Sequence, residues 1–267
     1  MKIRIDKLLV DRGMFPSRER AQAMILAGRV LVNEQKIEKP GTTVAEDSEL
    51  RLLGEDLKYV SRGGLKLEAA LEHWRIDLAG RSCIDVGTST GGFTDCMLQH
   101  GAREVVAVDT GYGQIAARLR SDARVKLLEK TNARYFTPEL LSLAGPAAPV
   151  TFIAIDVSFI SVTLILPALL QAVFALPQTT ASQQRVIHVS SEVQQGREIV
   201  ILVKPQFEVG KTKVGKGGIV RDAGAQQSAV EKVKHCVNAL GGQKIEVMDS
   251  PILGAEGNRE FLLHAEF

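Results

Sequence analysis

The stretch Ser82-Cys83-Ile84-Asp85-Val86-Gly87-Thr88-Ser89-Thr90-Gly91-Gly92 decides the fold. Its first half reads as a buried strand, and its second half as a turn built from small residues. Small residues let the backbone approach a ligand closely, and the helix predicted over 93–100 offers free N–H groups at its start. The stretch therefore predicts a strand, a ligand-binding turn and a helix in succession.

The same alternation continues to the end of the chain. Further strands are predicted over 104–109, 125–129, 151–157, 198–204, 245–248 and 261–264, and further helices over 112–120, from 157 to 176 and over 222–240. Such repetition predicts an α/β fold with a doubly wound, mostly parallel seven-stranded sheet. Ligands of such sheets bind at the carboxyl ends of the strands.

The first 60 residues follow a different pattern. A short amphipathic helix is expected over 5–10, a second helix after Ser17 as N-cap, and short strands near 29–33, 43–44 and 50–53. This small α+β module is too short to bury a large core. Residues 1–40 carry nine Lys and Arg against five acidic residues. We therefore expect a basic N-terminal domain over 1–60, a linker near 54–64 and a second domain over 61–267.

Composition excludes several protein classes. The 267 residues are 45% hydrophobic and 24% charged, with a net charge of +2, which argues against whole-chain disorder and a globally basic coat. Three widely spaced Cys and five scattered His predict a reducing, cytoplasmic compartment and no metal site. No apolar segment follows the first residues, so no secretory signal is expected.

Two further stretches need an interpretation. Residues 157–176 carry no charge, but Pro167 and several polar residues interrupt them, which favours a buried helix over a membrane span. The polar, Gln-rich stretch 178–197 reads as a long surface loop.

Residues at the first two strand ends suggest a nucleoside cofactor. Asp109 lies 22 residues after Gly87, where a carboxylate can accept both ribose hydroxyls of an adenosine. The glycine spacing is not G-x-G-x-x-G, which disfavours a nicotinamide, whereas an acid in the first turn suits the cationic groups of S-adenosylmethionine. Asn132 could face the adenine edge. The candidate cofactor-binding residues are Asp85, Gly87, Ser89, Gly91, Gly92, Asp109, Asn132 and Asp156.

Two charged residues follow buried strands directly. Asp156 comes after Ile153-Ala154-Ile155, and Lys204 comes after the apolar run 199–203. A charge beside apolar strands is costly unless it is paired. We therefore expect Asp156 and Lys204 to face one cleft and to meet. Taken alone, such a pair could be a structural salt bridge or part of a functional site.

Residues spread along the whole chain resemble those of a known family. Lys66, Asp156, Lys204 and Glu260 match the Lys-Asp-Lys-Glu tetrad of FtsJ-type ribose 2′-O-methyltransferases. The strings 108–114, 131–134, 156–161 and 203–210 extend the resemblance to the TlyA/haemolysin-like rRNA methyltransferases. The N-terminal module is similar to the αL RNA-binding domain of that family. The matching residues are Arg4, Asp6, Lys7, Ser17, Arg18, Gly28, Val30, Val32 and Asn33.

The resemblance implies a Rossmann-like methyltransferase that transfers a methyl group from S-adenosylmethionine to a ribose 2′-hydroxyl of ribosomal RNA, with cytidine as the nucleotide. Lys204 would take the hydroxyl proton or steady the oxyanion, and Asp156 would orient Lys204. Lys66 and Glu260 would hold the ribose. The expected partner is ribosomal RNA or a ribosomal subunit. The expected phosphate contacts are Arg4, Lys7, Arg18 and Arg20.

Three alternatives remain open on the sequence. The chain could be an RNA-binding ribosome-assembly factor with little catalysis, although the tetrad is intact. It could be a membrane-active haemolysin, as the family's other name and the uncharged stretch suggest. It could also be a nicotinamide-dependent enzyme, against which the glycine spacing argues.

Overall fold

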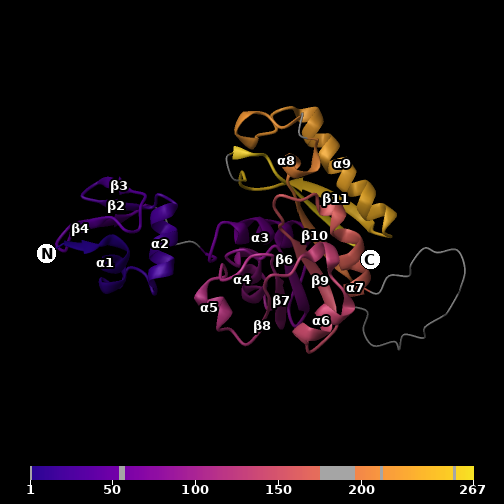
Figure 1. Cartoon of the computed structure of the whole chain (residues 1–267), viewed down its shortest axis with the longest axis horizontal. Coiled ribbons are helices and arrows are strands. Elements are labelled where there is room, and N and C mark those ends of the chain that lie inside the picture. Colours follow the sequence, from indigo (N-terminus) through magenta and orange to yellow (C-terminus); the bar gives the residue numbers. More distant parts are fainter. Residues whose placement is uncertain (1, 54–57, 175–195, 211–212, 255–256) are drawn as a thin grey trace, which may run out of the picture.

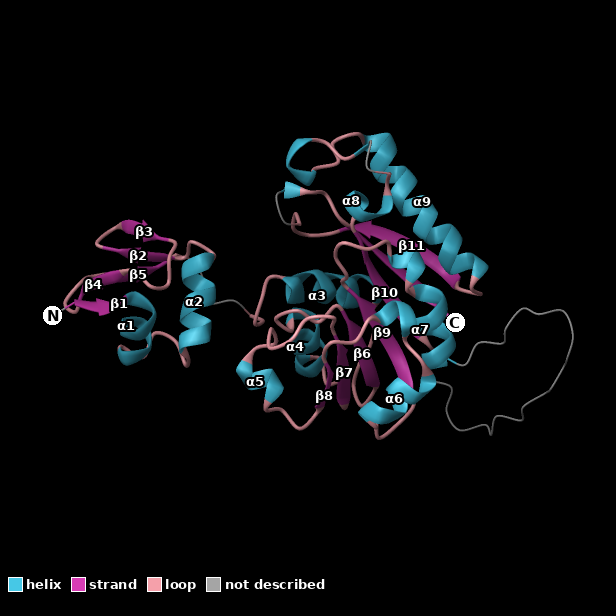
Figure 2. Ribbon diagram, viewed as in Figure 1, coloured by secondary structure: helices cyan, strands magenta, loops and turns pink. Residues whose placement is uncertain are grey.

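The chain folds into two units, each with its own hydrophobic core (Figures 1 and 2). The computed structural model describes residues 2–53, 58–174, 196–210, 213–254 and 257–267. The predicted α/β class is confirmed for the larger unit, which carries a seven-stranded sheet.

The seven-stranded sheet has the order β11-β12-β10-β9-β6-β7-β8. Neighbouring strands run parallel except for β12, which is antiparallel to both β10 and β11. The predicted, mostly parallel sheet is therefore confirmed. Its strands are β6 (Ser82–Val86), β7 (Glu104–Val108), β8 (Val125–Leu128), β9 (Val150–Ile155), β10 (Glu198–Val203), β11 (Gln243–Asp249) and β12 (Phe261–Glu266).

Helices cover both faces of this sheet. Successive residues of a strand point to opposite faces, so Ile84 and Val86 enter one core while Cys83 enters the other. The first face is covered by α7 (Leu166–Phe174) and α9 (Ala223–Ala239), and the second by α3 (Gly63–Trp74) and α4 (Gly92–Gln99). Shorter helices are α5 (Ala117–Arg120), α6 (Pro138–Ala144), α8 (Pro205–Glu208), η1 (Ala133–Tyr135), η2 (Val162–Leu164) and η4 (Lys216–Gly218).

The N-terminal unit has the expected α+β composition. The side chain of Ser17 accepts a hydrogen bond from the backbone of Arg20, which confirms the predicted N-cap. Gly28 has φ +66° just after the helix, as a C-terminal glycine should. Its elements are β1 (Lys2–Arg4), α1 (Ile5–Asp11), α2 (Arg18–Leu26), β2 (Val30–Val32), β3 (Gln35–Ile37), β4 (Thr43–Ala45) and β5 (Leu50–Leu52).

Several predicted helix limits are wrong. The helix expected over 112–120 is formed only by α5, because Gly111 and Gly113 hold an open turn before it. In its described part, 157–174, the apolar stretch is helical only as η2 and α7, with Pro167 in the first turn of α7. Helices α6 and α3 were not predicted, and α3 begins inside the linker expected near 54–64. Most of the Gln-rich stretch lies outside the described residues.

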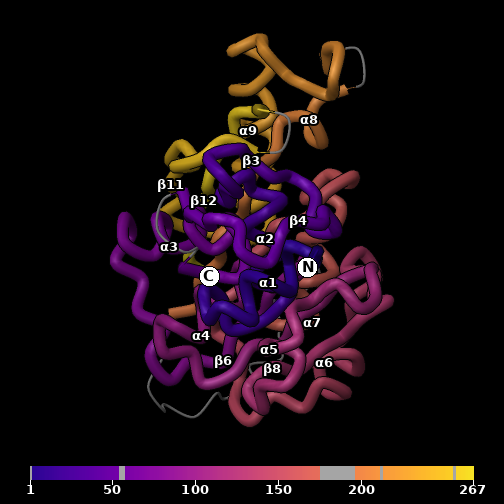
Figure 3. The backbone as a smooth tube through the Cα atoms, turned by 90° about the vertical axis from the view of Figure 1, so that its left-hand side faces the viewer, coloured from indigo at the N-terminus to yellow at the C-terminus, as the bar shows by residue number. Residues whose placement is uncertain are grey.

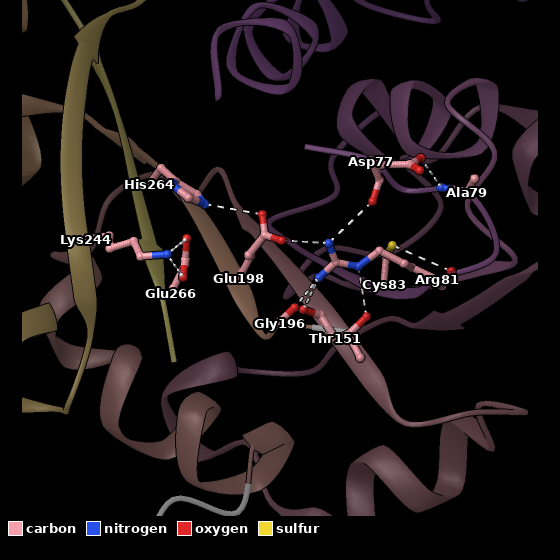
Figure 4. Close-up of polar contacts among 10 residues, drawn as sticks. All are labelled: Asp77, Ala79, Arg81, Cys83, Thr151, Gly196, Glu198, Lys244, His264 and Glu266. Atoms are coloured by element: carbon pink, nitrogen blue, oxygen red, sulfur yellow. Dashed lines mark hydrogen bonds and ion pairs between the residues drawn. The ribbon is translucent and has the colours of Figure 1, made fainter. Parts of the chain in front are cut away.

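Arg81 connects the amino ends of the parallel strands β6, β9 and β10, at the end of the sheet opposite the tetrad residues. Its guanidinium donates to Thr151 Oγ1 at 2.9 Å, to Gly196 O at 2.9 Å and to Glu198 Oε1 at 2.9 Å (Figure 4). Glu198 in turn lies 3.3 Å from His264 Nε2. This buried network ties β6, β9, β10 and β12 together, which makes the sheet a rigid support for its other end.

In the described part of the chain, none of the helices has both the length and the apolar content that a bilayer crossing requires. Among the same residues, no three His, Cys, Asp or Glu side chains come close enough to hold a metal ion.

Candidate active site

The sheet topology brings three of the four tetrad residues, Asp156, Lys204 and Glu260, to one edge. Asp156 and Lys204 follow β9 and β10, which are parallel neighbours, so their carboxyl ends lie together. Glu260 precedes β12, which runs antiparallel to β10 with Phe261 opposite Val203. The start of β12 therefore lies at the same edge, as expected for a site built on strand ends.

Lys204 and Asp156 meet, as predicted. Lys204 Nζ lies 2.5 Å from Asp156 Oδ1 and donates a hydrogen bond to Ser158 Oγ at 2.9 Å. The Lys204 side chain is 12% exposed and that of Asp156 is 22% exposed. The ammonium is thus fixed by two partners but remains open to the cavity on one side.

Lys66 and Glu260 form the second pair of the tetrad. Lys66 Nζ lies 2.5 Å from Glu260 Oε2, and both residues are buried. A Cβ atom at Gly254 would lie 2.0 Å from Glu260 Oε1, so a glycine is needed there to leave room for the carboxylate. The two pairs carry no net charge, so their burial costs less than that of four unpaired charges.

Two cavities adjoin at this edge. The larger, of about 810 Å³, is lined by Lys66, Asp156 and Lys204 together with residues of α2. The smaller, of about 530 Å³, lies over the ends of β6 and β7. Both volumes lie in the range of small-molecule sites. The residues shared by the two linings are Gly87, Ser89, Asp156 and Ser158.

The smaller cavity fits a nucleoside. Asp109 lines it, and its carboxylate accepts hydrogen bonds from Ser89 N at 2.7 Å and from Gly111 N at 2.6 Å. These bonds fix the carboxylate and leave further lone pairs for ribose hydroxyls. Gly87 has φ +90°, and a Cβ there would lie 2.3 Å from Asp156 O. Asn132 also lines the cavity, and its side chain accepts a hydrogen bond from Arg134 N at 3.0 Å.

The other cofactor candidates occupy different positions. Gly92 lines the larger cavity, whereas Gly91 lines neither of the two and is instead the N-cap residue of α4, with φ +96°. Asp85 also lies outside both linings and is fully buried. Its Oδ2 atom accepts hydrogen bonds from Thr94 N at 2.9 Å and Thr94 Oγ1 at 2.6 Å, while Oδ1 has no hydrogen-bond partner among the described residues. Asp85 therefore connects the end of β6 to the start of α4 and stabilises the glycine-containing turn between them.

Asp85 should make stability depend on pH. Burial raises its pKa to about 7, and the nearby Asp156 adds to this effect. An unfolded aspartate has a pKa of about 3.9. Between that pH and about 7 the folded chain therefore binds more protons than the unfolded chain. The free energy of unfolding falls as pH rises through this window. In Asp85→Asn this contribution is absent. Between about pH 5 and pH 8, the free energy of unfolding measured in urea should fall more for the unmodified protein than for Asp85→Asn. An equal change in the two proteins would contradict the raised pKa of Asp85.

The four residues of the N-terminal unit that were predicted to contact RNA differ in their hydrogen-bond partners. Arg4 Nη2 and Arg18 Nη2 lie 2.9 and 2.8 Å from the same oxygen of the buried Asp6, and these bonds, led by that of Arg4, hold the pKa of Asp6 well below its usual value. Both guanidiniums remain about half exposed. Arg20 donates to Tyr59 O at 2.6 Å, and Lys7 is exposed. Asp6 thus holds two arginines side by side.

Sequence reasoning missed residues of the segment after β9. Ser158 lines both cavities and contacts Lys204. Phe159 has φ +67° and is 92% exposed at the smaller cavity, with its ring 5.4 Å from that of Phe207. An exposed aromatic ring in a rarely adopted backbone conformation is typical of a functional position. Its only sequence signal is its place inside the string 156–161.

A buried carboxylate joins the two segments that carry Asp156 and Lys204. Glu208 accepts hydrogen bonds from Ser161 Oγ at 2.5 Å and Val162 N at 2.7 Å, and Lys232 donates to it at 3.1 Å. Because α8 begins directly after Lys204, this tie fixes the distance between the ends of β9 and β10.

Two family models and several named proteins are similar to this chain. Residues 59–267 match the model of the FtsJ-like methyltransferases, and residues 3–50 match the S4 domain. A Bacillus subtilis protein, provisionally named the rRNA methyltransferase YqxC, is 44% identical over 98% of this chain and 85% of its own. The Mycobacterium tuberculosis protein named 16S/23S rRNA (cytidine-2′-O)-methyltransferase TlyA is 41% identical over 98% of this chain and 89% of its own.

One solved structure is similar over almost the whole chain. It is a Streptococcus thermophilus protein that carries a hemolysin name, 41% identical, with a TM-score of 0.70 over 99% of this chain and 88% of its own. The resemblance stated from the sequence is thereby confirmed. On the match over 59–267, the chain belongs to the FtsJ-like methyltransferase family.

Proposed function

We propose that this protein transfers a methyl group from S-adenosylmethionine to a ribose 2′-hydroxyl of ribosomal RNA. The observation that carries the proposal is a set of four ionic side chains from distant parts of the chain, joined as two ion pairs. They lie in or beside a cavity of about 810 Å³, next to a second cavity with a carboxylate placed for a nucleoside ribose.

The chemistry requires little beyond alignment and the handling of one proton. S-adenosylmethionine, when bound, supplies a methyl group already activated by its sulfonium. As a neutral amine, Lys204 takes the proton from the 2′-hydroxyl; as an ammonium, it instead steadies the oxygen as negative charge develops on it. Asp156 and Ser158 hold the Lys204 Nζ atom at the boundary between the two cavities, so that it reaches a hydroxyl in the larger one.

The second pair acts on the substrate ribose. Lys66 lines the larger cavity, and Glu260 holds its ammonium from behind. An ammonium donates hydrogen bonds and accepts none, so Lys66 suits the neighbouring ribose and phosphate oxygens. We assign the cofactor to Gly87, Ser89, Asp109, Asn132 and Asp156, with Asp85, Gly91 and Gly92 shaping the turn.

The two units divide the work. We propose that residues 1–60 bind RNA and residues 61–267 bind the cofactor and catalyse. The match to the S4 domain and the half-exposed arginines on Asp6 support the first assignment. Such cations contact phosphates and position RNA without reading its sequence. Since the mycobacterial relative is named for cytidine in both ribosomal subunits, we propose a cytidine of ribosomal RNA as the target, reached in the cytoplasm.

The test is transfer of labelled methyl from S-adenosylmethionine to purified ribosomal RNA and to each ribosomal subunit. We expect labelled RNA whose digestion yields 2′-O-methylcytidine. A 2′-O-methyl group also blocks alkaline cleavage at that nucleotide, which gives an independent readout. Label found on a base would overturn the ribose assignment, and tight RNA binding without any transfer would instead favour an assembly factor.

A further inference from the structure

A second basic segment lies in the larger unit. Residues 210–221 read Gly-Lys-Thr-Lys-Val-Gly-Lys-Gly-Gly-Ile-Val-Arg, with four cations and no acid. In the described part, 213–221, the residues Lys213, Lys216 and Arg221 are exposed. None of these three takes part in an ion pair with the residues that the structure describes. The segment, which we name the basic loop (213–221), projects beyond the rest of the chain in two perpendicular views (orange, Figures 1 and 3).

The basic loop has a defined shape. Gly215 N donates to Ile219 O at 3.0 Å, and Gly218 N donates to Gly215 O at 3.1 Å. Gly217 and Gly218 adopt φ +76° and +74°, values that favour glycine. The three cations are therefore carried by a turn whose backbone is already fixed.

Asn258 fastens the basic loop to the wall of the active site. Its buried side chain donates to Gly218 O at 3.0 Å and accepts from Val220 N at 3.1 Å. Its backbone oxygen accepts from Gly254 N at 2.8 Å, and Gly254 lines the larger cavity. Asn258 also lies two residues before Glu260. One side chain thus links the basic loop to the residues that enclose the substrate cavity.

We propose that the basic loop binds phosphates of the RNA strand that leads to or from the target ribose. The inference rests on the function proposed above and adds a second RNA contact, distinct from the N-terminal unit. Uncompensated, exposed cations on a fixed turn suit a polyanion, since little order is lost on binding. Its attachment beside the ribose cavity favours RNA over an acidic protein as the occupant.

The test uses the full chain with Lys213, Lys216 and Arg221 all replaced by Gln. At about 0.1 M salt we expect the KM for ribosomal RNA to rise about 10-fold or more, with kcat and cofactor affinity unchanged. The dependence of log KM on log salt should flatten by up to about 2, at roughly 0.7 for each single-strand phosphate that the variant no longer neutralises.

The chain offers a matched control. Arg75, Arg103 and Lys244 are exposed cations at the opposite end of the sheet, and their triple Gln variant has the same net charge. We expect its KM to match that of the unmodified protein. Equal KM values for the two triple variants would overturn the proposal. An effect seen with ribosomal subunits but absent with protein-free RNA would also overturn it, in favour of an acidic protein contact.

RNA binding measured without turnover keeps this test separate from the proposed function. If the unmodified protein transfers no methyl group, the proposed function fails. In that case, weaker filter binding of protein-free ribosomal RNA by the basic-loop variant alone would still support the loop contact. Equal binding by both variants would contradict it.

Discussion

Replacing Lys204 by Ala is expected to slow methyl transfer by about 10²–10⁴-fold, the usual effect of removing a positioned acid–base group. Lys204 is held by Asp156 at 2.5 Å and by Ser158 at 2.9 Å, and it faces the larger cavity. Without the Lys204 side chain, the reaction lacks both the neutral amine that would take the hydroxyl proton and the ammonium that would steady the developing oxyanion. The rate should be measured in single turnover with labelled cofactor and enzyme in excess over RNA.

The matched control is Lys244→Ala. Lys244 also pairs with a carboxylate, Glu266, but at the opposite end of the sheet (Figure 4). Its loss should leave the rate unchanged. Calorimetric titration with the cofactor should give the same affinity for both variants, which separates loss of chemistry from loss of fold. A Lys204→Ala enzyme with the full rate would remove Lys204 from the mechanism.

Replacing Glu260 by Ala is expected to lower the free energy of unfolding by about 3–5 kcal/mol and to abolish efficient transfer. The substitution leaves the buried Lys66 ammonium without its carboxylate, and an unpaired buried charge has a cost of this size. Urea unfolding, followed at one temperature and pH, measures the loss.

A double variant separates stability from function. With Lys66→Met and Glu260→Leu together, no charge is left unpaired, and apolar residues of similar volume often replace a buried ion pair at little cost. We expect most of the unfolding free energy to return while methyl transfer stays low. A double variant with normal transfer would reduce the pair to a structural salt bridge.

The sheet could be predicted because its strands are distinctive in sequence. Runs such as 199–203 are apolar at every position, as strands covered on both faces must be. The pairing of Asp156 with Lys204 could be predicted for the same reason. Each residue directly follows an apolar strand, where a charge needs a partner and the end of the other strand supplies one. The position of Glu260 could not be derived locally, because it depends on the antiparallel pairing of β12 with β10, 58 residues apart at Val203 and Phe261. Only the family resemblance indicated it.

The remaining differences have local physical causes. The residues before α5 are helix-compatible in composition, but two glycines and a hydrogen bond from Gly113 N to Glu129 Oε1 hold them in a turn. Asp85 was expected to favour the cationic groups of the cofactor, directly or through water; in the structure it is fully buried, and its Oδ2 atom accepts a hydrogen bond from Thr94 Oγ1. Arg4 and Arg18 read as freely exposed cations, because nothing in the sequence indicates that Asp6 is buried between them.

The most direct test of the account is mass-spectrometric mapping of ribose methylation in ribosomal RNA from cells with and without this protein. We predict that one or a few cytidines lose their 2′-O-methyl group when the protein is absent. Supplying the unmodified protein should restore the group, and supplying Lys204→Ala should not. An unchanged ribose map, or a lost methyl group that proves to lie on a base, would contradict the account.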